Sequence, residues 1–383
     1  MTIPEKFNAI RPFNPEELPQ AYDRLLADPQ FQQVLTYLYP GIPLETLREQ
    51  MHLCPTLLDF QKAFAYKFIK KIMAEISDGF TLDAGHLDIE KRYTFISNHR
   101  DIVLDPGLLD VLLIDAGFQT TCEIAIGDNL LTRPWVKDLV RLNKSFIVQR
   151  SLPMRQLLEA SRILSEYMHF AIAQKKENIW IAQREGRAKD SDDRTAEGVL
   201  KMMAMAGDGT PTQRLMQLHL VPVAISYEYD PCDFLKAKEF QQRRDNPQFK
   251  KSAEDDILSM RTGMMGRKGR VHYQAASCID NYLASLPVTM SKTELYKHIA
   301  VHIDREIHAR YRLYPNNYAA LDLLNGTSEH ASCYTTQQLE AFEQYIDRQI
   351  ARIDLPNKDE PYLRERILTM YANIAINYLK AHE

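Results

Sequence analysis

Hydrophobic residues recur at helical spacing in the first part of the chain, and prolines such as Pro15 and Pro29 interrupt them. Residues 57–73 show this spacing most clearly, and we interpret their apolar face as ordinary core. Because no alternation of apolar and polar residues is evident here, residues 1–88 are predicted to form a helical N-terminal region. The apolar face of residues 57–73 consists of Leu57, Phe60, Phe64, Phe68 and Ile72.

From Tyr93 the pattern changes to short apolar runs rich in β-branched residues, separated by longer segments with helical spacing. Such alternation of strands and helices is typical of an α/β sheet with parallel crossovers. A further run, residues 269–273, fits a strand at an edge of that sheet. The other predicted strands are residues 93–97, 121–126, 146–148, 178–182 and 220–225.

Helical spacing returns after about residue 286, in segments 294–311, 336–353 and 362–379. The whole pattern predicts an α/β fold with a mixed, largely parallel sheet covered by helices. The predicted regions are a helical N-terminal region (1–88), an α/β domain (89–285) and a helical C-terminal region (286–383).

Charge and cysteine content exclude several classes of protein. The 47 Lys and Arg against 51 Asp and Glu give a net charge of −4, which argues against a surface built throughout for nucleic acid or anionic lipid. The five cysteines are scattered and never form a C-x-x-C pair, which disfavours a disulfide framework or a zinc site and fits a reducing cytoplasm. No window approaches the roughly 18–20 uncharged apolar residues of a membrane span, so we expect a protein that is soluble or lies on a membrane.

The loop after predicted strand 93–97 carries His99 with two nearby carboxylates, Asp101 and Asp105. Ligands of α/β sheets bind beyond the carboxyl ends of the strands, so this loop is a candidate site. A carboxylate can fix one imidazole tautomer and leave the other ring nitrogen free to accept a proton. The alternative is that Asn98 or Asp101 caps a helix while His99 is solvated.

The loop after predicted strand 178–182 is rich in cations. Arginine offers a bidentate donor fork and glycine allows close approach to the backbone, so the loop suits a phosphate. The alternative is a solvated turn whose internal ion pairs contribute little. The residues concerned are Arg184, Glu185, Gly186, Arg187 and Lys189.

Local charge favours an anion site. Residues 131–189 contain twelve Lys and Arg but five Asp and Glu, and Arg150 lies among them just after predicted strand 146–148. A histidine base beside such cations predicts activation of a hydroxyl on a phosphorylated or otherwise anionic substrate. Nucleic acid fits less well because the basic segment contains few aromatic residues. Motifs for nucleotide hydrolysis, zinc proteolysis, serine hydrolysis and dinucleotide binding do not occur in the sequence.

Four blocks, in order, resemble those of the glycerolipid acyltransferase superfamily, which includes glycerol-3-phosphate and lysophosphatidic acid acyltransferases. The first is similar to the family's N-H-x4-D or H-R-S-x-x-D box. The resemblance covers about residues 89–285, and the flanking helical regions resemble those of a bacterial subgroup of glycerol acyltransferases. The blocks are Asn98-His99-Arg100 with Asp105-Pro106, Gly127-Asp128 with residues 146–150, Glu185-Gly186-Arg187, and Val221-Pro222-Val223.

The resemblance implies that His99 is a general base and that no metal, cofactor or covalent acyl-enzyme takes part. Here five residues separate His99 from Asp105 where the family has four, so either Asp101 or Asp105 could orient the imidazole. We favour Asp105, because it precedes Pro106 as the family's aspartate often does. The implied acceptor-binding residues are Arg150, Glu185, Gly186 and Arg187, and the candidate substrate-binding residues also include Arg100 and Lys189.

The resemblance also implies the partners. The donor would be an acyl thioester, acyl-CoA or acyl carrier protein, and the acceptor a glycerol-3-phosphate or lysophosphatidic acid hydroxyl in phospholipid synthesis. A lipid product and the lack of a spanning segment lead us to expect a cytoplasmic enzyme in peripheral contact with the inner face of the cell membrane. The alternatives are an O-acyltransferase for another lipid acceptor, such as a lyso-aminolipid, and a catalytically silent lipid-binding protein.

Overall fold

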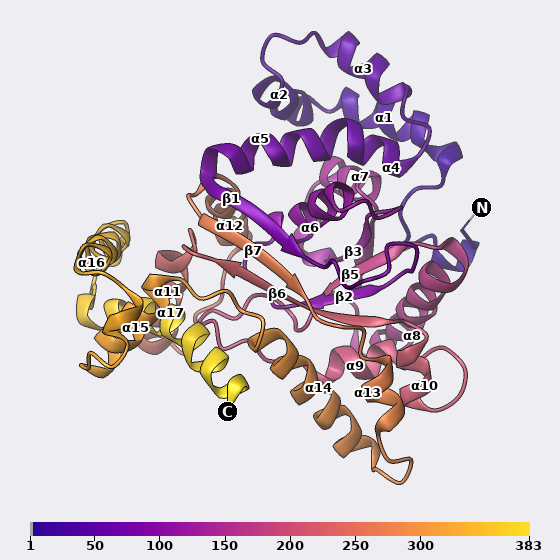
Figure 1. The fold of residues 1–383 in the computed structure, drawn as a ribbon. Coiled ribbons are helices and arrows are strands. Elements are labelled where there is room, and N and C mark those ends of the chain that lie inside the picture. The colour runs from indigo at the N-terminus through magenta and orange to yellow at the C-terminus, as the bar shows by residue number, and fades with distance from the viewer. Residues whose placement is uncertain (1–2) are drawn as a thin grey trace.

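A seven-stranded sheet forms the centre of the computed structural model, which describes residues 3–383 (Figure 1). The strands lie in the order β1-β7-β6-β2-β5-β3-β4; the last five are parallel, and β1 and β7 run in the opposite direction. The predicted α/β class with a mixed, largely parallel sheet is therefore confirmed. The strands are β1 (Ser77–Asp83), β2 (Thr94–Ser97), β3 (Cys122–Gly127), β4 (Ser145–Val148), β5 (Asn178–Ala182), β6 (Leu220–Tyr227) and β7 (Gly269–Ala275).

The five parallel strands were predicted to within two residues at either end, because each is a short apolar run buried on both faces. Two predictions about the part of the sheet that contains β1 and β7 are wrong. β7 is not an edge strand, since it lies between β1 and β6. Residues 1–88 are not entirely helical, since β1 occupies the edge next to β7; its Ser77-Asp78-Gly79 start resembles a turn, and of its residues only Phe80 and Leu82 supply apolar side chains to the core.

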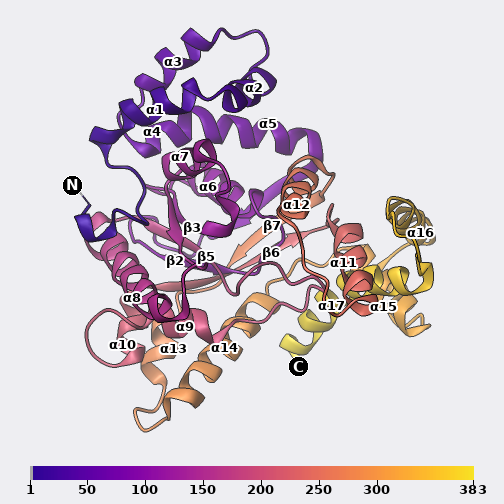
Figure 2. The same ribbon diagram turned by 180° about the vertical axis from the view of Figure 1, so that it is seen from behind.

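Helices cover both faces of the sheet (Figures 1 and 2). Successive strand residues face opposite layers: Phe95 packs with the layer of α5 and α6, and Ile96 with the layer on the other face. The first layer consists of α5 (Tyr66–Ile76) and α6 (Leu104–Asp115). The second consists of α8 (Met154–Phe170), which ends in a π-helical turn (Ala171–Lys175), α9 (Glu197–Met203), α10 (Pro211–Met216), α13 (Asp280–Ser285) and α14 (Lys292–His308).

Helices α1, α2 and α3 lie above α5 at the top of Figure 1, and they share a hydrophobic core with α4 and α7. A π-helical turn, Gln61–Ala65, joins α4 to α5, so the predicted helix 57–73 is continuous. These helices are α1 (Leu18–Ala27), α2 (Pro29–Leu38), α3 (Leu44–His52), α4 (Leu57–Phe60) and, from the middle of the chain, α7 (Pro134–Leu142).

The C-terminal helices form a further cluster beside β6 and β7, with a core that includes Phe342, Ile367 and Tyr371. Predicted helices 294–311, 336–353 and 362–379 correspond to α14, α16 and α17. The remaining helices are α11 (Asp233–Asp245), α12 (Ala253–Met265), α15 (Pro315–Asn325), α16 (Thr336–Ala351) and α17 (Glu360–His382), with short 3-10 turns at 5–7, 15–17, 128–130 and 331–333. Within residues 3–383, no helix is long and apolar enough to cross a membrane.

Candidate active site

Three consecutive residues after β2 point to different parts of the molecule. The side chain of Asn98 accepts a hydrogen bond from the backbone N–H of Ile225 (2.7 Å) and donates one to its carbonyl (2.9 Å), which ties the loop to β6. His99 faces a groove, and its ring lies edge-on to Trp180 with centroids 5.5 Å apart. Arg100 is buried on the opposite side. The loop is therefore held by its neighbours while His99 remains accessible.

His99 and Asp105 form a hydrogen-bonded dyad. Oδ2 of Asp105 lies 2.7 Å from Nδ1 of His99 and also accepts from the backbone N–H groups of Arg100 (2.5 Å) and Asp101 (2.9 Å). Its Oδ1 accepts from the Tyr227 hydroxyl (2.8 Å), whose pKa burial and the Asp105 charge raise well above the usual value. A carboxylate so placed selects the tautomer with the proton on Nδ1, which leaves Nε2 to accept a proton.

Asp101, the other candidate orienting residue, does not contact the imidazole. Its Oδ1 accepts hydrogen bonds from the backbone N–H groups of Val103 (2.9 Å) and Leu104 (2.8 Å), at the start of α6. Its Oδ2 lies 3.6 Å from the ammonium of buried Lys268. Asp101 thus performs the capping role considered from the sequence, and Asp105 is the residue placed to orient His99.

The groove that His99 faces has a volume of about 1530 Å³. Much of its wall is apolar and comes from α2, the α4 to α5 segment and α7. The face of residues 57–73 interpreted as ordinary core contributes to this wall: Phe60, Phe64 and Ile72 are buried, yet they and Phe68 line the groove. Further apolar lining residues are Phe31, Val34, Leu35, Trp135 and Leu139.

The loops after β4 and β5 bring cations to the same groove, where nine Lys and Arg face four Asp and Glu. Nη1 of Arg187 is shielded from solvent and has no hydrogen-bond partner among the described residues. Arg150 lies 3.4 Å from the exposed carboxylate of Glu185, and Lys189 lies 2.8 Å from Glu239. Gly186 has a φ of +67°, a conformation that favours glycine. Arg150, Glu185, Gly186, Arg187 and Lys189 therefore meet at one groove.

Arg100 is the predicted substrate-binding residue that the structure does not place there. Its side chain is 3% exposed and forms an ion pair with Asp193 at 2.6 Å. The alternation of successive side chains at a strand end could have indicated that Arg100 points away from His99. Tyr227, which bonds Asp105, gave no local signal, because it lies 122 residues further along the chain.

A group of possible metal ligands lies far from the dyad. In the part of the chain that the structure describes, the ligand atoms of His219, Cys278 and Asp280 lie within 4.8 Å of one another. His219 precedes β6, and the other two residues follow β7, which is antiparallel to β6. They therefore lie at the amino ends of the parallel strands, whereas His99 lies at the carboxyl end of β2. These residues do not contribute to the groove.

A known protein family matches the part of the chain that contains the candidate site. Residues 81–226 match the family model described as Acyltransferase, a range that contains the dyad, Arg150 and Arg187. Residues 81–226 are thus similar to an acyltransferase domain, and the predicted resemblance to the glycerolipid acyltransferase superfamily is confirmed.

A similar solved structure is the 1-acyl-sn-glycerophosphate (LPA) acyltransferase PlsC from Thermotoga maritima. It is 14% identical, with a TM-score of 0.37, and the match covers 76% of this chain and 93% of that chain. No curated protein matches the sequence.

Proposed function

We propose that the protein transfers a fatty acyl group from an acyl thioester to a hydroxyl of glycerol-3-phosphate or lysophosphatidic acid, with His99 as the general base. The observation that carries this proposal is the His99 and Asp105 dyad, which faces a groove with both cationic and apolar walls. A phosphorylated acceptor and a fatty acyl chain need these two kinds of surface together.

The chemistry follows from the tautomer. Nε2 of His99 takes the proton from the acceptor hydroxyl as its oxygen attacks the thioester carbonyl, and Asp105 stabilises the imidazolium that forms. Collapse of the tetrahedral intermediate breaks the C–S bond and expels the thiolate. The imidazolium then returns the proton to the sulfur, so the ester and the free thiol are the products and His99 is regenerated.

Arg187 and Arg150 would bind the phosphate of the acceptor. The partnerless Nη1 of Arg187 is shielded from water, and a phosphate oxygen would satisfy it. Arg150 faces the same groove, and its acidic neighbour Glu185 is exposed, so the arginine can exchange that contact for a phosphate. The acyl chain of the donor would lie against the aromatic and aliphatic residues of α2 and the α4 to α5 segment.

The groove rim supports peripheral contact with the inner face of the cell membrane. Ile257 and Leu258 of α12 line the groove but are 45% and 48% exposed, and Arg261 lies on the same helix, whereas Lys251 is paired with Asp256 at 2.9 Å. We expect sedimentation with anionic phospholipid vesicles that decreases with salt, since Debye screening weakens surface attraction. An I257E/L258E variant should remain in the supernatant, and equal sedimentation of this variant would contradict the assignment of the rim.

An acyl-transfer assay tests the proposed function. Purified protein is given labelled palmitoyl-CoA or palmitoyl-acyl carrier protein with glycerol-3-phosphate, lysophosphatidic acid or a lyso-aminolipid. We expect His99-dependent esterification of a phosphorylated acceptor. Preference for the lyso-aminolipid would establish the alternative acceptor, and no transfer with any pair would support a lipid-binding protein without catalysis.

A further inference from the structure

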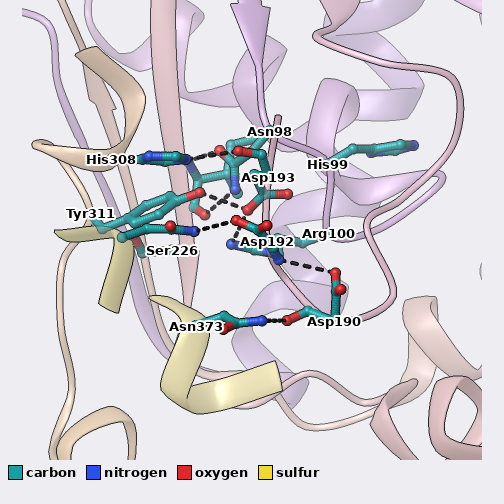
Figure 3. A network of polar contacts seen from close by, with 12 residues as sticks. Asn98, His99, Arg100, Asp190, Asp192, Asp193, Ser226, His308, Tyr311 and Asn373 are labelled. Atoms are coloured by element: carbon teal, nitrogen blue, oxygen red, sulfur yellow. Dashed lines mark hydrogen bonds and ion pairs between the residues drawn. The ribbon is translucent and has the colours of Figure 1, made fainter. Parts of the chain in front are cut away.

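The Arg100 side chain leaves the catalytic loop in the direction opposite to His99 (Figure 3). Its guanidinium is buried and lies 2.6 Å from Oδ2 of Asp193, which is itself 1% exposed. The backbone N–H of the same Arg100 donates to Oδ2 of Asp105, the oxygen that also contacts His99. The position of Arg100 is therefore coupled to the dyad through one shared carboxylate oxygen.

Asp193 belongs to the loop between β5 and α9, which also carries Arg187. The Arg100 contact with Asp193 consequently joins the two loops that form the candidate active site, one with the base and one with the anion-binding cations. The two residues are 93 positions apart in the sequence. Their contact therefore ties the loop of His99 directly to the loop of Arg187.

Helices of the C-terminal region hold the same loop at several points (Figure 3). The Tyr311 hydroxyl donates to Oδ2 of Asp193 (2.6 Å), and His308 bonds its carbonyl (2.8 Å). The neighbouring contacts are those of Asn373 with the Asp190 carbonyl (2.9 Å), Asn377 with Asp192 (3.1 Å) and Asp304 with the backbone and hydroxyl of Thr195 (2.7 and 2.6 Å).

Stability alone gives a weak reason for this arrangement. A buried ion pair carries a large desolvation cost, and well-packed apolar residues often serve stability equally well. A charged pair that is also bonded by Tyr311 does, however, specify one arrangement of the groups around it. Such rigid support is what a base needs, because small displacements of a reacting group cost much of its rate.

We propose that Arg100 and Asp193 are positioning residues, through which Tyr311 and the C-terminal helices hold the His99 loop and the Arg187 loop in their working arrangement. This inference rests on the proposed function, in which His99 is the base. It gives the helical region after residue 286 a positioning role in the reaction, without contact with substrate.

Two tyrosine variants form a matched test. Tyr311→Phe removes the hydroxyl that bonds Asp193, and Tyr334→Phe removes one that bonds Asp322 (2.8 Å), a buried carboxylate of α15 that forms no ion pair with Arg100. Both lose one hydrogen bond to a buried acid on the C-terminal side. We expect Tyr311→Phe to lower kcat by about 10- to 100-fold with both KM values nearly unchanged, and Tyr334→Phe to leave kcat unchanged. Asp193→Asn should also lower kcat, and because it leaves the buried Arg100 guanidinium without its counter-charge it should lower Tm as well.

A spectroscopic measurement separates positioning from folding. The Nδ1 proton shared by His99 and Asp105 should give a downfield ¹H NMR signal that His99→Ala abolishes. We expect Tyr311→Phe to shift or broaden this signal and Tyr334→Phe to leave it in place. An unchanged signal and wild-type kcat in Tyr311→Phe, with activity still lost in His99→Ala, would overturn the positioning role while keeping the proposed function. Retained activity in His99→Ala would overturn the function itself.

Discussion

Oδ2 of Asp105 contacts Nδ1 of His99 at 2.7 Å, although Asp101 is four residues closer to the histidine in sequence. The reason is the start of α6. Asp101 caps the helix with its side chain, so its carboxylate turns toward the helix N-terminus. Asp105 lies in the first helical turn, where its side chain points back to the loop, and Oδ2 receives the imidazole together with two backbone N–H groups.

Substitution of the two aspartates should therefore have unequal effects. We expect Asp105→Asn to lower kcat by about 10²–10⁴-fold, because an amide no longer selects the tautomer or stabilises the imidazolium. Asp101→Asn keeps an oxygen that can cap α6, so its kcat should stay within a few-fold of wild type. Steady-state kinetics of both variants decide the matter; a larger loss in Asp101→Asn would show that the dyad is assigned to the wrong carboxylate.

Arg187 and Arg150 should govern acceptor binding. A charge-assisted hydrogen bond contributes about 1.5–3 kcal/mol, so Arg187→Ala and Arg150→Ala should raise the acceptor KM about tenfold or more, with little change in the thioester KM. Arg187→Ala should have the larger effect, since Arg187 is the more buried and its Nη1 is unpartnered. The control is Arg155→Ala, an exposed cation of α8 outside the groove.

Two results would count against this assignment. Loss of thermal stability without a change in acceptor KM would mean that the arginines only hold their loops. Equal activity on an uncharged acceptor would show that the protein does not recognise a phosphate of the acceptor.

Asp110 should make stability depend on pH. It is buried in α6 and accepts hydrogen bonds from the backbone of Cys122 (2.7 Å) and the amide of Gln61 (3.1 Å). Burial raises its pKa to about 7, whereas the carboxyl of the unfolded chain titrates near about 3.9. Between these values the folded state keeps a proton that the unfolded state has released. The Asp110 contribution to stability therefore falls as pH rises from about 4 to about 7, by up to about 1.4 kcal/mol per pH unit.

Asp110→Asn removes this titration while preserving the shape of the side chain. Measured as the free energy of unfolding, the variant should gain relative to wild type between pH 5 and pH 8. Glu75→Gln, at an exposed position of α5, should show no such change. A difference between Asp110→Asn and wild type that stays constant with pH would contradict the raised pKa.

Much of the central sheet was predictable because its parallel strands are buried on both faces and interrupted by polar loops. The strand 178–182 was predicted at its observed bounds. β1 was missed because its alternation is carried by two apolar residues after a turn-like start, and this omission made β7 resemble an edge strand. The apolar face of residues 57–73 gave no sign that a groove runs along it, since a core helix and a groove-lining helix have the same periodicity.

The site was predictable only in part. His99 follows β2 and Arg187 follows β5, and these strands are parallel neighbours. The topology alone therefore places both residues beyond the carboxyl ends of the strands. The family resemblance favours Asp105 over Asp101, whereas the physical reason for the choice, the position at which α6 begins, is not given by local sequence. The contact of Arg100 with Asp193 joins distant segments, and no local pattern encodes it.

The most direct test of the account is the turnover of His99→Ala in the acyl-transfer assay with a phosphorylated acceptor. The His99 side chain is 12% exposed and packs edge-on against Trp180, so circular dichroism and Tm are measured beside kcat to show that the variant is folded. We predict that its kcat falls by about 10²–10⁴-fold, the usual contribution of a positioned general base. Turnover close to wild type in the folded variant would contradict the claim that His99 is the base.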